Sequence, residues 1–242
     1  MNNRTPVFSL DEENIWFDVY LKSTTQKAFS KNEVKLLNAI WVCTSYPDAR
    51  LWNNRVAGLA ASSQSTQELG LSAALSVSEA TIYGGGPGVK SIDFLIKCRI
   101  ELEKGQNLKN LVTEKIKTDK IYGFGRPINN VDERLQWISK IACELGLDKG
   151  PHLKIAKNIE SILLEKSPNL KMNYSAMSAG LCADLGFSVR EYQKFRVPQL
   201  LAGMTPCWVE SQKNGPNSLF KMDCSDISYT GTKHRKWQES EQ

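Results

Sequence analysis

The sequence has few histidines and no closely paired cysteines, and both shortages exclude common kinds of site. Its two histidines are His152 and His234, and its six cysteines are scattered without any Cys-x-x-Cys pair. Zinc sites and disulfide frameworks need such ligands at short or regular spacing, so we expect neither. A Ser–His–Asp set is not credible either, because His152 lies in a helix-start context and His234 in a polar tail. We expect reduced thiols in a cytoplasmic protein.

Long apolar runs and a strong charge are missing as well. No apolar run reaches the roughly 18 residues that suggest a membrane-spanning helix, and the N-terminal stretch MNNRTPVFSLDEEN lacks the apolar segment of a signal peptide. The net charge is a mild +5. A basic cluster at residues 233–236 is interpreted as a solvated tail. We expect neither a membrane nor a nucleic-acid partner, while anionic small molecules fit as ligands.

The alternating pattern of strands is nearly absent, whereas apolar residues repeat at helical spacing. The sequence therefore predicts an all-α protein. Ser30 or Asn32 is a candidate cap for the helix that follows, and Pro198 and Pro206 are expected to kink or split the last helix. Residues 1–31 are predicted to form an N-terminal arm with one short aromatic helix at 11–21, ahead of a helical domain over 32–242. The helices expected in that domain cover 32–44, 50–82 with a break near 62–66, the stretch from Pro87 to Gly105, 106–118, 131–146, 151–166, 173–185 and 189–211.

Two glycine-rich loops resemble nucleotide-binding motifs without meeting their requirements. In GGGPGVKS, residues 84–91, Val89 stands where a phosphate-binding loop needs glycine directly before the lysine. In GFGRPI, residues 123–128, Ile128 replaces the third glycine of a dinucleotide-binding loop, and no strand precedes it. Both stretches are interpreted as loops between helices, whose free backbone N–H groups can still meet an anion at a helix N-terminus.

Read in order, these loops resemble the citrate synthase family, including the citrate-synthase-like module of ATP-citrate lyase. The likeness covers about residues 32–231, and the first third to half of a typical member has no counterpart. It implies an all-helical fold with a large and a small subdomain, the small one over about 84–187. It also implies a homodimer or a pairing with a homologous subunit. The stretches that carry it are WNNRVAGLAASSQS (52–65), IYGGGPG (82–88), GFGRPINNVDER (123–134), LKMNYSAMSAGLCADLGF (170–187), LLAGMTPCWVES (200–211) and YTG (229–231).

The resemblance also implies a chemistry whose acid and base groups this chain has lost. In the family an aspartate deprotonates an acyl-CoA, a histidine stabilises the enolate, and arginines with further histidines hold a 2-oxo acid. At the matching positions this chain has Tyr83 and Arg126 for two histidines and Ser175 for the aspartate. Ser45 aligns roughly with a substrate-binding histidine.

The remaining groups suit binding better than proton transfer. Arginine does not shuttle protons, and a serine hydroxyl without a partner base is a poor general base. Arg126 is therefore interpreted as an anion clamp, Tyr83 as a hydrogen-bond donor to a carbonyl or enolate, and Ser175 as the third member of an altered catalytic set.

Four further positions complete the predicted site. Arg134, from the Asp-x-Arg motif, keeps a carboxylate-binding identity, and Asn173 beside Ser175 is predicted to contact substrate. Gly123 and Gly125 belong to the turn KIYGFG, which resembles the CoA-contacting loop of the family.

Three functions stay open at this point. The first is a divergent enzyme that binds an acyl-CoA or acyl-carrier thioester, an organic acid or both, and forms or cleaves a carbon–carbon bond other than that of citrate synthesis. It would use no tightly bound cofactor and no metal, with the coenzyme A thioester entering as a substrate. The second is a non-catalytic pseudoenzyme that senses a ligand or partners an active homologue. The third is an unrelated helical interaction protein.

Overall fold

The computed structural model describes residues 16–81, 84–126, 131–219, 225, 228 and 230–232. In this part of the chain the regular elements are all helices, with two isolated β-bridges and no strand, which confirms the all-α prediction. The helices are α1 (Trp16–Thr25), α2 (Lys31–Thr44), α3 (Trp52–Ser62), α4 (Gln67–Ser78), α5 (Gly85–Glu103), α6 (Leu108–Thr118), α7 (Arg134–Glu144), α8 (Pro151–Leu164), α9 (Tyr174–Asp184) and α10 (Val189–Lys213).

Local sequence signals explain where several helices begin. Ser30 caps α2 in a capping box: its hydroxyl accepts from the N–H of Glu33, and the Glu33 carboxylate accepts from the N–H of Ser30. The predicted break in the long alanine- and serine-rich stretch is also present, since α3 ends at Ser62 and Thr66 caps α4. Because these signals are local, the sequence alone located these helix ends.

Two expectations about the chain ends need adjustment. The aromatic helix expected at 11–21 is found at Trp16–Thr25, while residues 11–15 lie outside the described part. The last helix is not split at Pro198 or Pro206, because α10 runs unbroken through both, and the expected kink stays a prediction. Each proline removes one backbone donor. Packing of α10 against α3, α4 and α5 supports the helix on both sides of the two prolines, where these hydrogen bonds are missing.

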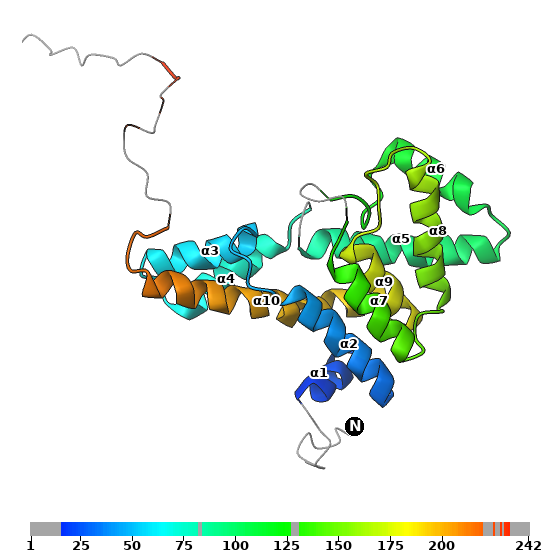
Figure 1. Cartoon of the computed structure of the whole chain (residues 1–242), viewed down its shortest axis with the longest axis horizontal. Helices are drawn as coiled ribbons and strands as arrows, with labels where there is room; N and C mark the ends of the chain where they lie inside the picture. Colours follow the sequence, from blue (N-terminus) through cyan, green and yellow to red (C-terminus); the bar gives the residue numbers. More distant parts are fainter. Residues whose placement is uncertain are drawn as a thin grey trace, which may run out of the picture.

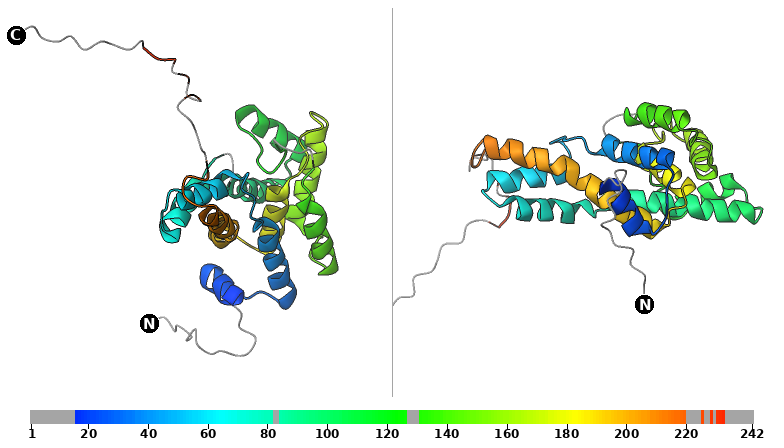
Figure 2. Two further views of the ribbon diagram at one scale, coloured as in Figure 1. Left: turned by 60° about the vertical axis from the view of Figure 1, so that its left-hand side comes forward. Right: turned by 90° about the horizontal axis from the view of Figure 1, so that it is seen from below.

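The helices fall into an elongated arm and a broader body (Figure 1). The arm consists of α3, α4 and the C-terminal part of α10, which lie side by side in both further views (Figure 2). Its small core contains Ala57, Ala61, Ala74, Met204 and Trp208. The body holds α5 to α9 around a much larger core, and the N-terminal part of α10 joins the two. The elements that carry the predicted site residues all begin or end near this junction.

Helix α1 is held to the body by aromatic packing. Phe17 meets the Trp41 ring edge-on at 4.7 Å between centroids, and Trp41 lies 5.5 Å from Phe195 of α10. The Trp41 indole N–H donates to the Phe195 carbonyl at 3.0 Å. Aromatic pairs of this kind combine large buried area with a preferred geometry.

None of the described helices is long and apolar enough to span a membrane.

The core of the body is tested most simply on α5. Ile92 is fully buried where α5 meets α8 and α9, whereas Ile100 on the same helix is 45% exposed. Ile92→Ala should lower the free energy of unfolding by about 2–5 kcal/mol, since it leaves a cavity. Ile100→Ala should change it by less than about 1 kcal/mol. Urea unfolding followed by circular dichroism measures both, and equal effects would contradict the packing described here.

Candidate functional site

The turn at 123–125 is fixed against the segment that precedes α9. The N–H of Gly125 donates to the Lys171 carbonyl at 2.7 Å, and the N–H of Asn173 donates to the Gly123 carbonyl at 2.9 Å. Gly123 and Gly125 have φ of 95° and 80°, in the left-handed region that favours glycine. A Cβ at Gly123 would also lie 2.6 Å from both the Ser91 hydroxyl and the Ala176 methyl. The turn therefore needs glycine for conformation and for close packing between α5 and α9.

Asn173 connects this turn to the first turn of α9. Its side-chain oxygen accepts from the N–H of Ser175 at 2.9 Å, which makes it the N-cap of α9. Its side-chain NH₂ donates to the Gly125 carbonyl at 2.9 Å. The amide thus has backbone partners on both sides, and the predicted contact of Asn173 with substrate stays a prediction.

A buried carboxylate, Asp132, joins three parts of the site. Its side chain has no exposed surface. Arg134 donates to it twice, from Nε at 2.8 Å and from Nη2 at 2.7 Å, in the two-pronged geometry that makes arginine–carboxylate pairs strong. The N–H of Tyr174 donates to the same carboxylate at 2.8 Å. Asp132 therefore connects the residues before α7 to the N-terminus of α9.

The charge state of Asp132 follows from these partners. Burial by itself would raise the pKa of the Asp132 carboxyl, but the Arg134 hydrogen bonds and charge, the Tyr174 N–H and the Arg126 charge outweigh it. The pKa of Asp132 consequently lies below its usual value. A carboxylate stabilised in its ionised form and enclosed by donors is a structural anchor and a poor proton acceptor.

The two predicted anion-binding arginines both have acidic neighbours. Arg126 donates to the Glu133 carboxylate at 2.6 Å and to the Val131 carbonyl at 3.1 Å. The Glu133 side chain is 64% exposed, so solvent screens this pair, and Arg126 also lies 3.8 Å from the Asp132 carboxylate. Arg134 is held more firmly, between the buried Asp132 and the face of the Tyr174 ring at 4.6 Å. Of the two arginines, Arg126 is the better placed to exchange partners.

The predicted catalytic set is only partly covered by the described residues. The Ser175 hydroxyl oxygen is buried and has no hydrogen-bond partner, so no base activates it in this arrangement. The hydroxyl of Ser91, on the other side of Gly123, is likewise buried and unpartnered. Tyr83 lies outside the described residues. Ser45 ends α2 and donates its hydroxyl to the Trp41 carbonyl at 2.8 Å, so its predicted role also stays a prediction.

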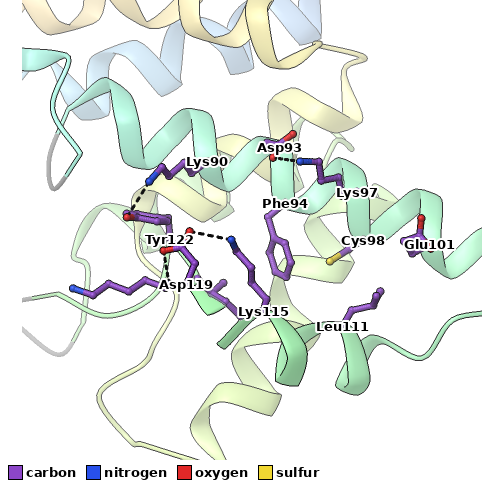
Figure 3. Close-up of a pocket in the computed structure, with 12 residues that line it drawn as sticks. Lys90, Asp93, Phe94, Lys97, Cys98, Glu101, Leu111, Lys115, Asp119 and Tyr122 are labelled. Carbon is purple, nitrogen blue, oxygen red and sulfur yellow. Dashed lines mark hydrogen bonds and ion pairs between the residues drawn. The ribbon is translucent and has the colours of Figure 1, made fainter. Parts of the chain in front are cut away.

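A pocket of about 440 Å³ lies between α5, α6 and the residues that lead into Gly123 (Figure 3). Phe94 projects from α5 into the space beside α6, and Leu111 and Ile121 add apolar surface. Tyr122 is the last residue of its lining before the glycine turn. The lining of the pocket thus ends one residue before the glycine turn and includes none of the predicted site residues.

Lysine is the most frequent residue type around this pocket. Lys97 pairs with Asp93 at 2.7 Å and Lys115 with Asp119 at 3.0 Å. Lys90 instead donates to the Tyr122 hydroxyl at 3.2 Å and lies 4.4 Å from the centre of its ring. The lining contains four lysines, Lys90, Lys97, Lys115 and Lys120, against the acidic residues Asp93, Glu101 and Asp119.

The described residues offer neither a cluster of metal ligands nor a reactive thiol beside the pocket. They contain no cluster of His, Cys, Asp and Glu that could hold a metal ion. Their cysteines are free thiols, and burial raises the pKa of the Cys98 thiol beside the pocket to about 12. A thiol with so high a pKa is not a nucleophile at neutral pH.

Sequence reasoning missed several residues that shape the site. Asp132 and Glu133 stand inside the quoted Asp-x-Arg motif, but a sequence does not say which carboxylate pairs with which arginine. Lys90 lies within the first glycine-rich stretch and Tyr122 directly before the second, and their pairing depends on how α5 packs. For Lys90, the preceding Gly-Val-Lys pattern was a usable signal of a cation near the site.

The family model described as "Citrate synthase, C-terminal domain" matches residues 1–222. The chain belongs to the citrate synthase family. No curated protein sequence gives a significant match.

Solved structures share the citrate synthase fold. A citryl-CoA lyase from Hydrogenobacter thermophilus superposes with a TM-score of 0.82 at 18% identity, covering 93% of this chain and 88% of that one. An ATP citrate lyase from Methanosaeta concilii, in complex with (3S)-citryl-CoA, gives a TM-score of 0.76 at 17% identity, with 90% of this chain covered. A Thermoplasma acidophilum citrate synthase, in complex with carboxymethyl coenzyme A and oxaloacetate, gives 0.71 at 16% identity, with 94% covered. The chain spans 37% of that ATP citrate lyase and 60% of that citrate synthase.

The role of Asp132 predicts a specific response to pH. Because its pKa is lowered in the folded protein, its contribution to stability is complete above the unfolded-state value of about 4. That contribution is lost as the pH falls through the lower folded-state value. Asp132→Asn should cost about 2–3 kcal/mol at pH 7, less than for a fully enclosed ion pair because the Arg134 side chain is 34% exposed.

Urea unfolding between pH 7 and pH 2.5 measures this response, with the exposed Asp93→Asn as the matched control. The Asp132 variant should lose less stability on acidification than the wild type, while Asp93→Asn should follow the wild type. If Asp132→Asn and the wild type have parallel pH profiles, the carboxylate does not anchor the site.

Proposed function

We propose that this protein binds a coenzyme A thioester and takes part in forming or cleaving a carbon–carbon bond next to the thioester carbonyl. The observation that carries the proposal is the lysine-lined pocket, which opens beside the glycine turn of a citrate synthase fold. The structural relatives named above include proteins in complex with citryl-CoA and with carboxymethyl coenzyme A. The structural likeness to these relatives supports the fold of this chain, and the lining of the pocket supports coenzyme A as its ligand.

The chemistry of the pocket suits the nucleotide end of coenzyme A. Several phosphate groups require cations, and Lys90, Lys97 and Lys120 are among the residues that line the pocket; Lys97 would have to leave its present partner Asp93 to bind a phosphate. The adenine ring requires an apolar or aromatic surface, which Phe94 and Tyr122 provide. An acyl group on a carrier protein would bring one phosphate group but no adenine ring. It would therefore fill less of this pocket than coenzyme A.

At the other end of the ligand, the thioester would lie among Tyr83, Arg126 and Ser175. In this arrangement Tyr83 donates to the carbonyl, and Arg126 exchanges Glu133 for the anionic part of an organic acid. Arg134 supports this region from its position on Asp132. Without the family's histidines and aspartate the reaction is not citrate synthesis. We place the protein in the cytoplasm, in keeping with the free thiols of its described cysteines.

A second candidate is a non-catalytic member that senses a ligand or partners an active homologue. It is favoured by one observation: the Ser175 hydroxyl, at the position of the family aspartate, has no base to activate it. Turnover of an acyl-CoA by the isolated protein would exclude this candidate. Binding of an acyl-CoA without turnover by the isolated protein, together with turnover once a homologue is added, would favour it.

Binding is tested by thermal unfolding in the presence of acetyl-CoA. Saturating ligand should raise the Tm by several degrees, since a ligand at about 100 times its Kd adds about 2.7 kcal/mol to stability. The double variant Lys90→Glu/Lys97→Glu should weaken binding at least about tenfold and remove most of this shift. Arg126→Ala should reduce it for acetyl-CoA together with an organic acid such as oxaloacetate.

A charge reversal outside the pocket controls for net charge. Lys140 on α7 is exposed and lies 3.9 Å from Glu144, so Lys140→Glu should leave the acetyl-CoA shift unchanged. A wild-type protein whose Tm does not respond to acetyl-CoA, CoA or organic acids would contradict the proposed function.

We also propose a homodimer formed through the arm. The arm has a small core, yet Leu59 of α3 and Leu69 of α4 are 42% and 66% exposed. Leu59→Glu/Leu69→Glu should convert a dimer into a monomer in sedimentation-equilibrium experiments. Leu164→Glu, at a 38% exposed leucine of α8 in the body, should leave the mass unchanged. A monomeric wild type would exclude the dimer.

A further inference from the structure

Tyr174, the first residue of α9, contacts three other parts of the chain around the predicted site. Its backbone N–H donates to the Asp132 carboxylate at 2.8 Å, its hydroxyl donates to the Ile40 carbonyl of α2, and its ring lies under the Arg134 guanidinium of α7. The residue is buried. One enclosed aromatic side chain therefore joins α2 and α9 to an arginine of the predicted site.

The hydroxyl of Tyr174 attaches its ring to α2. Burial raises the pKa of the Tyr174 phenol well above its usual value, so the hydroxyl stays protonated at neutral pH and acts as a donor. The Ile40 carbonyl that accepts from it also accepts from the Thr44 hydroxyl at 3.1 Å, at the end of α2. The ring is held by its own backbone on one side and by α2 on the other, so its position beneath Arg134 is fixed.

The ring in turn restrains one face of the Arg134 guanidinium. The guanidinium carbon lies 4.6 Å from the centre of the ring, within the roughly 6 Å over which a cation and an aromatic face attract each other. Asp132 holds the edge formed by Nε and Nη2, at 2.8 and 2.7 Å. A planar group that is held at one edge and on one face has a single orientation.

The second edge of the guanidinium is available to a ligand. An arginine side chain has five N–H donors, and Asp132 uses one on Nε and one on Nη2. Among the described residues, none accepts a hydrogen bond from Nη1 of Arg134, and the side chain is 34% exposed. Nη1 and the remaining N–H of Nη2 form an edge that matches the two oxygens of a carboxylate. Arg134 can therefore bind such a group without giving up Asp132.

From these contacts we infer that Tyr174 is a positioning residue, whose ring orients the Arg134 guanidinium so that its second edge receives a carboxylate of the organic acid. The inference rests on the proposed function for the ligand, whereas the contacts of Tyr174 are independent of it. Tyr174 touches no reacting atom in this account. It keeps Arg134 ordered before the ligand arrives, which avoids the cost of immobilising a long side chain on binding.

The contact is tested by a double-mutant cycle on Tm. Tyr174→Leu and Arg134→Ala should each lower the Tm by about 5–15 °C. The loss in the double variant should be smaller than the sum of the two single losses, because either substitution alone already removes the contact between ring and guanidinium. Additive losses would overturn the arrangement.

The positioning role is tested by calorimetric titration with oxaloacetate, succinate and pyruvate, at a temperature where every variant is folded. Tyr174→Leu should weaken the binding of the tightest of the three by about three- to tenfold, since the ligand must then order Arg134. Tyr174→Phe keeps the ring, so it should lower the Tm by about 2–6 °C and keep this affinity within about twofold. Both variants should bind acetyl-CoA as the wild type does.

Phe195→Leu controls for a general loss of stability. Phe195 is fully buried on α10, and its ring packs against Trp41 and Phe187. The substitution removes a buried ring, as Tyr174→Leu does, but this ring faces other aromatic residues instead of Arg134. It should lower the Tm by a similar amount and leave the affinity for the organic acid unchanged.

The outcomes separate the two proposals. An unchanged affinity in Tyr174→Leu, or an equal loss of affinity in Tyr174→Phe or Phe195→Leu, overturns the positioning role. A wild type that binds acetyl-CoA but none of the three acids also overturns that role, yet leaves the binding of the thioester standing. A wild type that binds none of these compounds overturns both, and the Tm cycle still decides whether the ring holds Arg134.

Discussion

The arrangement of this site depends on one enclosed carboxylate. Asp132 lies in a short stretch between the glycine turn and α7, and its side chain has no contact with solvent. There it accepts two hydrogen bonds from the Arg134 side chain, one from the Arg134 N–H and one from the first N–H of α9. An ionised group is costly to bury unless each of its oxygens has partners. Asp132 meets that condition by drawing α7, α9 and the preceding loop together.

The position of the other groups follows from that junction. With α9 fixed, Asn173 can cap it and hold the Gly125 carbonyl, and the glycine turn then packs between Ser91 and Ala176. Tyr122 precedes the turn and brings its ring to Lys90 at the mouth of the pocket. From the opposite side, Arg196 fixes the start of α5. A structural carboxylate and an amide thus support the loops in which the sequence predicts arginine and serine in place of the reactive groups of the family.

The sequence predicted the helices well because the signals are local. Apolar spacing, the Ser30 cap and the small-residue break before Thr66 depend on neighbours within a few positions. The split considered at Pro198 and Pro206 is absent, because contacts with distant helices hold α10 together through both prolines. The sequence identified Arg126 and Arg134 from a motif but not their acidic partners. Arg196 gave no local signal, because the glycine it contacts at position 85 lies 111 residues earlier in the chain.

The central claim is that coenzyme A enters the lysine-lined pocket and extends toward the glycine turn. A crystal structure of the protein soaked with acetyl-CoA and oxaloacetate tests it most directly. The account predicts electron density for the nucleotide beside Phe94 and Lys90, with the thioester among Tyr83, Arg126 and Ser175. An empty pocket at saturating ligand, or acetyl-CoA bound elsewhere on the chain, would contradict it.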